Sequence, residues 1–326
     1  MPPPIRLVCD RAPSSLCDGG PGAVGLRSPK RLGIGLALAA GLWATASWAM
    51  ASPTAPRPSP PDGATAVTLV SDSADGEPGV PLNGWWFVAP GAEPTPLRPA
   101  VVLLHGCGGI HDRQGQLARR YLDYVGLLHR QGMHALVLDS LTSRGEKELC
   151  TQTIGTRKVT QAQRRGDALA ALRWLARQPG VDASRLGLLG WSNGGSTVLA
   201  ATNETHRQVR GAEVHAAFAV AFYPGCTAEL RRGYRTSTRV LLLLGASDDW
   251  TPAEPCERLA RDAQGVAPQV VSYPGAFHGF DGTAPVRQRK DVPNGVRPGQ
   301  GVTVGANAQA REQALLRLQA FLDGPR

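Results

Sequence analysis

The apolar positions of the chain fall into short runs bounded by turn residues, which is the pattern of buried β-strands. Eight such runs are candidate strands: 65–70, 84–88, 100–104, 134–138, 186–189, 217–222, 240–244 and 269–273. Segments with helical spacing follow the third run onward, at 117–131, 161–178, 196–205, 254–264 and 308–322. Strands that alternate with helices predict an α/β domain with a mostly parallel, eight-stranded sheet covered by helices on both faces. The first two strands lack a helix between them, so we expect them to form an antiparallel hairpin or an edge.

The first 51 residues have the pattern of an export signal. Lys30 and Arg31 precede an uncharged stretch rich in Ala, Leu and Gly, and this stretch ends in a small-x-small cleavage site at residues 49–51. Cleavage there predicts an exported protein, periplasmic or secreted. An uncleaved signal anchor is the alternative, although the Ala and Gly content makes the stretch only weakly hydrophobic. The part before Lys30 is long for such a signal, so translation could begin near Val24.

A proline-rich linker separates this leader from the folded domain. Residues 52–61 read SPTAPRPSPP, and such proline density resists both helix and sheet. We therefore expect a linker over residues 52–64 and one folded domain over residues 65–326. No internal repeat and no second apolar core call for another domain.

The basic charge of the chain does not indicate a nucleic-acid partner. The formal net charge is +9, but residues 1–51 contain five basic and two acidic residues, so the remainder carries +6. These extra basic residues are scattered among acidic ones, and no series of aromatic residues that could stack on bases accompanies them. Beyond the possible anchor, no membrane partner is indicated either.

Four cysteines remain when the two in the leader are set aside, and an exported protein can oxidise them. Cys226 and Cys256 follow successive strands on the same rim of the expected sheet. We therefore predict disulfides Cys226–Cys256 and Cys107–Cys150. A metal site is disfavoured because no Cys-x-x-Cys pair or histidine cluster accompanies these residues.

The clearest chemical motif is GWSNG at residues 190–194, which follows a strand and precedes a helical pattern. A tight strand-to-helix turn of this kind needs glycines for close backbone approach, and it exposes the serine hydroxyl above the sheet. Ser192 is therefore the candidate nucleophile. The alternative is a glycine-rich turn in which the serine only caps a helix.

A second motif, HGCGG at residues 105–109, follows the strand predicted at 100–104. A loop in this position donates one backbone N–H to an oxyanion hole, and the residue after the nucleophile donates the other. The candidate donors are Cys107 and Asn193. His105 is interpreted as a structural residue that braces the loop.

The acid and base follow in the order Ser, Asp, His. Asp248 stands third after the glycine that ends the strand at 240–244, and we prefer it to Asp249, whose loss should be mild. His278 lies on the loop after the last strand and is the only histidine beyond Asp248. His278 would take the proton of Ser192, and Asp248 would orient the imidazole. This chemistry requires no metal and no organic cofactor.

These motifs together resemble the dienelactone hydrolase family of the α/β-hydrolase superfamily. The resemblance rests on HGCGG at 105–109, GWSNGG at 190–195, GASDDWTP at 245–252 and AFHGFD at 276–281. It implies the α/β-hydrolase fold and carboxylic ester hydrolase activity. Dienelactone hydrolases proper carry a cysteine where this chain has Ser192, so the sequence points to a serine variant acting on a small-molecule ester or lactone.

The resemblance also suggests substrate contacts. Family enzymes hold a substrate carboxylate with arginine, and Arg144 lies on a comparable strand-end loop, although a surface salt bridge would explain it equally. Trp191, Tyr223 and Trp250 adjoin strand ends and could line an acyl pocket, with core packing as the alternative.

Two other functions fit the same motifs less well. A peptidase or polyester depolymerase would be favoured by a large lid or an added domain, and neither is visible in the sequence. A catalytically silent binding protein would be favoured by the loss of one of the three proposed catalytic residues, and all three are present.

Overall fold

The computed structural model describes residues 60–72, 78–91 and 96–324. These residues lie in the second of the two units of the chain, Pro56–Arg326, and the description below concerns this unit alone. The predicted leader, residues 1–51, and most of the predicted linker lie outside the described residues. The hydrolase domain expected from residue 65 begins with a strand at Ala64.

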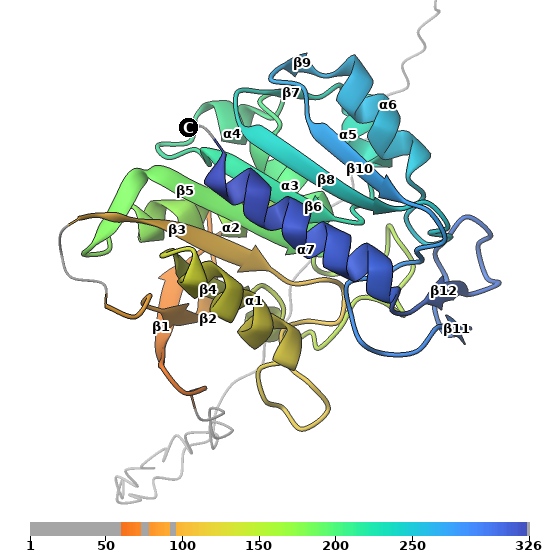
Figure 1. Ribbon diagram of the computed structural model, residues 1–326, viewed down its shortest axis with the longest axis horizontal. Helices are drawn as coiled ribbons and strands as arrows, with labels where there is room; N and C mark the ends of the chain where they lie inside the picture. The colour runs from red at the N-terminus through yellow and green to blue at the C-terminus, as the bar shows by residue number, and fades with distance from the viewer. Residues whose placement is uncertain (1–59, 73–77, 92–95, 325–326) are drawn as a thin grey trace, which may run out of the picture. The chain divides into compact units, whose positions relative to one another are not determined.

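An eight-stranded sheet forms the centre of the described unit (Figure 1). From one edge to the other its order is β1 (Ala64–Val70), β2 (Pro81–Phe87), β4 (His134–Asp139), β3 (Arg98–Leu104), β5 (Val181–Trp191), β6 (Phe218–Phe222), β8 (Arg239–Gly245) and β10 (Gln269–Tyr273). Strand β2 pairs antiparallel with both of its neighbours, and the other pairs are parallel. All eight predicted strands are therefore present, and the first two form the expected antiparallel edge.

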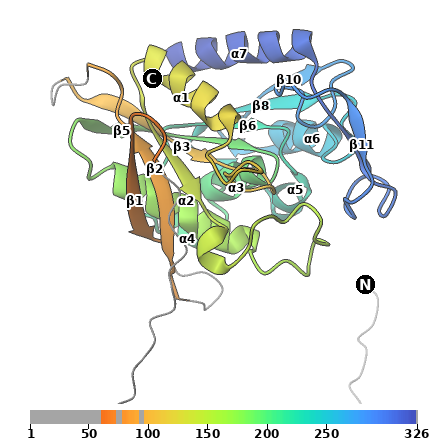
Figure 2. The ribbon, with the colours of Figure 1, turned by 90° about the horizontal axis from the view of Figure 1, so that it is seen from below.

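Helices cover both faces of the sheet, as predicted, because successive residues of a buried strand point to opposite sides. In β3, Val101 and Leu103 belong to the core on the face that α1 (Arg119–Arg130) and α7 (Ala308–Asp323) cover. The intervening Val102 and Leu104 belong to the core on the other face, where α2 (Gln161–Leu175) and α3 (Asn193–Thr202) contact β3 and α6 (Glu254–Asp262) contacts β10. Figure 2 shows α1 and α7 together on one side of the sheet, with α2, α3 and α6 opposite.

Several short elements escape the sequence pattern because each has too few residues to show a period. They are η1 (Thr142–Arg144), α4 (Arg207–Arg210), α5 (Thr227–Arg232), the pair β7 (Arg235–Thr236) and β9 (Gln264–Gly265), and the pair β11 (Arg287–Arg289) and β12 (Val302–Val304). The boundary predicted for the helix at 196–205 is also wrong. That helix begins at Asn193, directly after the strained turn.

The four cysteines of the domain lie in the two predicted pairs. The sulfurs of Cys107 and Cys150 are 2.04 Å apart, and those of Cys226 and Cys256 are 1.95 Å apart. The second pair joins the segment after β6 to helix α6. No helix among the described residues has the length and apolar character needed to cross a membrane.

The bond between Cys226 and Cys256 should stabilise the domain by restricting the unfolded chain. It closes a loop of 30 residues, for which the chain-entropy model gives about 3 to 4 kcal/mol. We expect the Cys226→Ala/Cys256→Ala variant to melt about 10 °C below the wild type in a thermal scan. An unchanged melting temperature, or four free thiols in the denatured wild type without reductant, would contradict the bond.

Candidate active site

Ser192 occupies a strained turn between β5 and α3. Its φ of 52° and ψ of −117° are unusual for a residue with a side chain. Two glycines allow this turn. A Cβ on Gly190 would lie 2.3 Å from the carbonyl oxygen of Gly194, and a Cβ on Gly194 would lie 2.0 Å from that of Leu104. The sharp turn predicted from GWSNG is therefore formed, and the serine stands at the carboxyl ends of the parallel strands.

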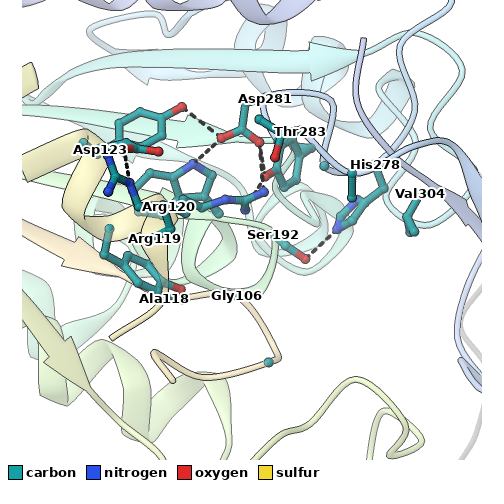
Figure 3. Close-up of a pocket in the computed structure, with 18 of the residues that line it drawn as sticks. Gly106, Ala118, Arg119, Arg120, Asp123, Ser192, His278, Asp281, Thr283 and Val304 are labelled. Carbon is teal, nitrogen blue, oxygen red and sulfur yellow. Dashed lines mark hydrogen bonds and ion pairs between the residues drawn. The ribbon is translucent and has the colours of Figure 1, made fainter. Parts of the chain in front are cut away.

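The hydroxyl of Ser192 is the first member of a chain of hydrogen bonds. Its Oγ lies 2.8 Å from Nε2 of His278, as Figure 3 shows, and Nδ1 of His278 lies 2.8 Å from Oδ2 of Asp248. All three residues are nearly buried, with exposures of 9%, 5% and 6% for Ser192, His278 and Asp248. The structure thus brings the three predicted residues together in the geometry that a serine nucleophile, a base and an orienting acid require.

The two neighbouring aspartates after β8 have separate roles. Asp248 accepts hydrogen bonds from the backbone N–H of Trp250 at 2.8 Å and of Thr251 at 2.9 Å, which fix its carboxylate toward His278. Asp249 accepts instead from the N–H and hydroxyl of Thr303, at 2.7 and 2.8 Å. Asp249 therefore anchors the β11–β12 segment, and Asp248 is the partner of the histidine.

Aromatic rings confine the imidazole of His278. The ring centroids of Tyr223 and Trp250 lie 4.6 and 4.5 Å from that of His278. Tyr223 holds its place with a φ of 38°, a second strained position at the end of a strand. Its backbone oxygen accepts a hydrogen bond from the Thr251 hydroxyl at 3.0 Å, which ties it to the loop of Asp248.

The HGCGG loop passes directly beside Ser192. A Cβ on Gly106 would lie 3.6 Å from the Cβ of Ser192, and Figure 3 places Gly106 next to the serine. Cys107 lines the cavity in front of Ser192. Asn193 begins α3, so its backbone N–H is one of those that a helix leaves without an intrahelical acceptor. The predicted donors therefore lie on the two segments that flank the nucleophile.

His105 has the bracing position expected of it. Its Nε2 accepts a hydrogen bond from the N–H of Ser140 at 3.1 Å, and its Nδ1 lies 2.6 Å from the carbonyl oxygen of Gly106. These contacts require a neutral ring with the proton on Nδ1. Burial, followed by the charge of Arg164, lowers the pKa of His105 to about 3.

A cavity of about 830 Å³ opens in front of Ser192 and His278. Trp191, Tyr223 and Trp250, the aromatic residues proposed to line an acyl pocket, all adjoin this cavity. Trp191 and Tyr223 are only 1% and 2% exposed and belong to the core, as the alternative of core packing predicts. Arg144 does not adjoin the cavity. Its guanidinium donates two hydrogen bonds to Asp167, at 2.9 and 2.7 Å, and one to the carbonyl oxygen of Ser140. The substrate-binding role suggested for Arg144 is therefore replaced by a buried ion pair behind the site.

Sequence reasoning missed a polar cluster around Asp281. Its buried carboxylate accepts hydrogen bonds from the hydroxyls of Tyr124 at 2.9 Å and Tyr223 at 2.6 Å and from the indole of Trp191 at 3.0 Å. Arg120 lies 3.4 Å from the same carboxylate, and Figure 3 shows these groups converging on Asp281. Burial, and next the charge of Asp281, raises the pKa of Tyr124, so its hydroxyl keeps its proton.

Only part of this cluster had a signal in the sequence. Asp281 stands three residues after His278 in the AFHGFD motif, where an acidic residue among apolar ones is unusual. Its partners on α1, Tyr124 and Arg120, fit an ordinary amphipathic helix and carry no sign of this contact. The cluster ties α1, the end of β5 and the histidine loop to one another.

Arginines dominate the charged lining of the cavity. Six arginines and two aspartates line it: Arg119, Arg120, Arg130, Arg287, Arg289, Arg311, Asp123 and Asp281. Within the described part of the chain, Arg287 and Arg311 have no carboxylate within 4.0 Å. The lining of the cavity therefore carries more basic than acidic residues.

The neutral state of His105 should make stability depend on pH. Because its pKa is about 3 in the folded protein and near 6.5 in the unfolded chain, the unfolded state binds more protons between these values. We expect the free energy of unfolding to fall by about 1.4 kcal/mol per pH unit as the pH drops through this window. A His105→Gln variant offers an amide oxygen near the position of Nε2 to accept from Ser140, and it has no group that titrates in this window. Urea unfolding of both proteins from pH 7 to 4 tests this, and identical pH slopes would contradict it.

Comparisons with solved structures concern the fold. An esterase from Thermogutta terrifontis, solved after phosphorylation by paraoxon, has a TM-score of 0.52 and 18% identity, over 81% of this chain and 97% of that one. The same esterase with butyrate bound has a TM-score of 0.51 and 18% identity, over 80% and 93%. A Klebsiella pneumoniae protein proposed to be a dienelactone hydrolase has a TM-score of 0.52 and 19% identity, over 80% and 99%. At these identities the structures show the shared α/β-hydrolase fold.

The sequence comparisons concern the family. None of the curated proteins compared with the chain matches it. The family model described as "Dienelactone hydrolase family" matches residues 87–324, which is most of the chain and includes all the residues of the site described above. The protein therefore belongs to the dienelactone hydrolase family and is a carboxylic ester hydrolase with the α/β-hydrolase fold.

Proposed function

We propose that this protein hydrolyses a small carboxylic ester or lactone through an acyl-enzyme on Ser192. The observation that carries the proposal is the unbroken hydrogen-bond chain from Ser192 through His278 to Asp248 at the wall of a cavity. A hydroxyl in this chain becomes nucleophilic because the neighbouring imidazole accepts its proton during attack.

The steps follow from this chain. The Ser192 oxygen attacks the acyl carbon while His278 takes the hydroxyl proton, and Asp248 stabilises the imidazolium that forms. The backbone N–H groups of Cys107 and Asn193 stabilise the negative oxygen of the tetrahedral intermediate. His278 then gives its proton to the leaving alcohol. A water molecule, deprotonated by the same histidine, cleaves the acyl-enzyme and regenerates Ser192.

The cavity favours an ester with a compact acyl group as the substrate rather than a polymer. Its wall carries Trp191, Tyr223 and Trp250 close to the serine, and the T. terrifontis esterase of the same fold has been solved with butyrate bound. No observation favours the peptidase or depolymerase alternative. A binding protein would have no use for the strained serine and its aligned histidine.

The charge of the cavity mouth favours an anionic substrate. Arg287 on β11 and Arg311 on α7 bring positive charge to the lining from two different elements. An ester with a carboxylate beyond its acyl carbon would place that group in a positive potential and gain affinity from it.

We also propose that the enzyme works outside the cytoplasm. The export pattern of residues 1–51 and the two cysteine pairs support this, because disulfides persist in oxidising compartments. Release from the membrane by cleavage after Ala51 is part of the same proposal.

Hydrolysis of short-chain p-nitrophenyl esters tests the proposed nucleophile and base. We expect Ser192→Ala and His278→Ala, each in a chain lacking residues 1–51, to lower kcat by more than about 10⁴-fold. Near-ultraviolet circular dichroism would show that both variants fold. Activity that survives Ser192→Ala would contradict the acyl-enzyme mechanism.

The two aspartates after β8 offer a matched pair of variants. Asp248→Asn should lower kcat on the order of 10⁴-fold because the amide cannot stabilise the imidazolium. Asp249→Asn should leave kcat within a few-fold, since Asp249 contacts Thr303 and not His278. Steady-state kinetics on one ester compares them. Equal losses in the two variants would show that the acid is wrongly assigned.

Ethyl butyrate and monoethyl succinate test the preference for an anionic substrate, because their acyl groups have equal length and differ in charge. We expect kcat/KM to be higher for monoethyl succinate and to fall as sodium chloride is raised. Arg287→Gln and Arg311→Gln should each lower that value about threefold and leave ethyl butyrate unchanged. Acid release followed by titration measures both esters. A salt-independent ratio near one would exclude the preference.

A further inference from the structure

Arg164 is a buried cation directly behind the two segments that flank Ser192. It lies in the first turn of α2, its exposure is 1%, and it is among the largest fully buried side chains of the described residues. Burial lowers its pKa to about 10, so the guanidinium is still charged at neutral pH.

The hydrogen bonds of Arg164 go to neutral groups. One terminal nitrogen donates to the side-chain oxygen of Asn193, and the other donates to the carbonyl oxygen of His105 at 2.8 Å. Its Nε is buried without a hydrogen-bond partner. Among the described residues no carboxylate lies within 4.0 Å of the guanidinium. The nearby charges of Asp167 and Asp139 act against the effect of burial on the pKa of Arg164, but the hydrogen bonds of Asp167 come from Arg144.

Such an arrangement is costly for folding alone. A buried charge without an ion pair loses its hydration, and an apolar side chain of similar size would fill the space more cheaply. The contrast with Arg144 is informative, since Arg144 is paired with Asp167 through two hydrogen bonds. The position of Arg164 therefore calls for an explanation other than stability.

The two acceptors of Arg164 belong to the two segments that carry the proposed oxyanion donors. His105 begins the HGCGG loop, whose Cys107 follows two residues later, and Asn193 is itself the second proposed donor residue. Gln161, in the same helical turn, donates to the carbonyl oxygen of Asn193 at 3.2 Å. One turn of α2 thus holds both sides of the nucleophile.

We propose that Arg164 is a positioning residue that sets the spacing of the two oxyanion donors, and that its buried charge adds positive potential where the oxyanion forms. The proposal rests on the acyl-enzyme function proposed above. Fixed donors need no reorganisation when negative charge develops, and charges act strongly where water is excluded. Arg164 would consequently stabilise the transition state and leave substrate binding almost unchanged.

The main variants are Arg164→Met, which removes the charge and both hydrogen bonds, and Arg164→Lys, which keeps the charge but cannot reproduce the fork of two donors. Leu172→Ala is the control, because Leu172 is fully buried on the same helix and belongs to the core cluster. We expect it to lower the melting temperature and leave kcat unchanged.

Three readouts separate positioning from simple stability. The first is the split between kcat and KM for a p-nitrophenyl ester, and the second is the rate constant for phosphorylation of Ser192 by paraoxon. The third compares the inhibition constant of a trifluoromethyl ketone, which forms a tetrahedral oxyanion, with that of butyrate, which does not.

We expect Arg164→Met to lower kcat and the paraoxon rate about 100-fold, with KM within about threefold. Arg164→Lys should lower kcat and the paraoxon rate about 10-fold. In both variants the affinity for the ketone should fall in parallel with kcat/KM, and the affinity for butyrate should not change.

The same measurements can overturn the proposal. Wild-type kcat in Arg164→Met, or a loss of kcat with unchanged affinity for the ketone, would show that Arg164 is only structural. If Arg164→Met does not fold, a wild-type paraoxon rate in Arg164→Lys would show that the two donors of the guanidinium are not needed, and it would overturn the proposal. A wild type that reacts with paraoxon and cleaves no ester would refute the proposed substrates alone, and the paraoxon rates would still decide the role of Arg164. A wild type that does not react with paraoxon would refute both proposals.

Discussion

The close approach of two backbone segments at Ser192, the end of β3 with its HGCGG loop and the turn from β5 into α3, is the constraint on which the site depends. The end of β3 and the start of α3 touch so closely that Gly194 has no room for a Cβ beside the carbonyl oxygen of Leu104. This contact forces the strained backbone of Ser192 and brings the HGCGG loop next to its side chain. A glycine-free turn would separate these segments, and the hydroxyl and the donors would no longer face a common point.

The sheet supplies the other parts of the site from neighbouring strands. Strands β5, β6, β8 and β10 run parallel, so the segments that follow them all emerge at the same edge. Ser192, Tyr223, Asp248 and His278 each follow one of these strands. Strain at two of these positions, Ser192 and Tyr223, is held by a core that is buried on both faces of the sheet.

Two buried charged residues, Asp281 and Arg164, lie near the edge of the sheet that carries the site. Asp281 gathers hydroxyl, indole and guanidinium donors from α1 and from the strand ends, and it is fully satisfied. Arg164 has the opposite character, with a buried nitrogen that lacks a partner. A satisfied network stiffens its surroundings, whereas the guanidinium of Arg164 donates to neutral groups on the two segments beside Ser192 and, in our proposal, adds positive potential there. The two groups therefore suit different tasks, support of the histidine loop and stabilisation of a developing anion.

The amino-acid sequence determined the eight strands, the helical layers and the order of the three reacting residues, because these follow from local periodicity and from motifs that are contiguous in the chain. It also placed Asp248 ahead of Asp249 through its distance from the strand-ending glycine. The tertiary structure alone decided the partners of Arg144, Arg164 and Asp281. Their contacts join helices to loops dozens of residues away, and a charged residue on a helix has the same sequence pattern whether it faces water, an ion pair or the back of an active site.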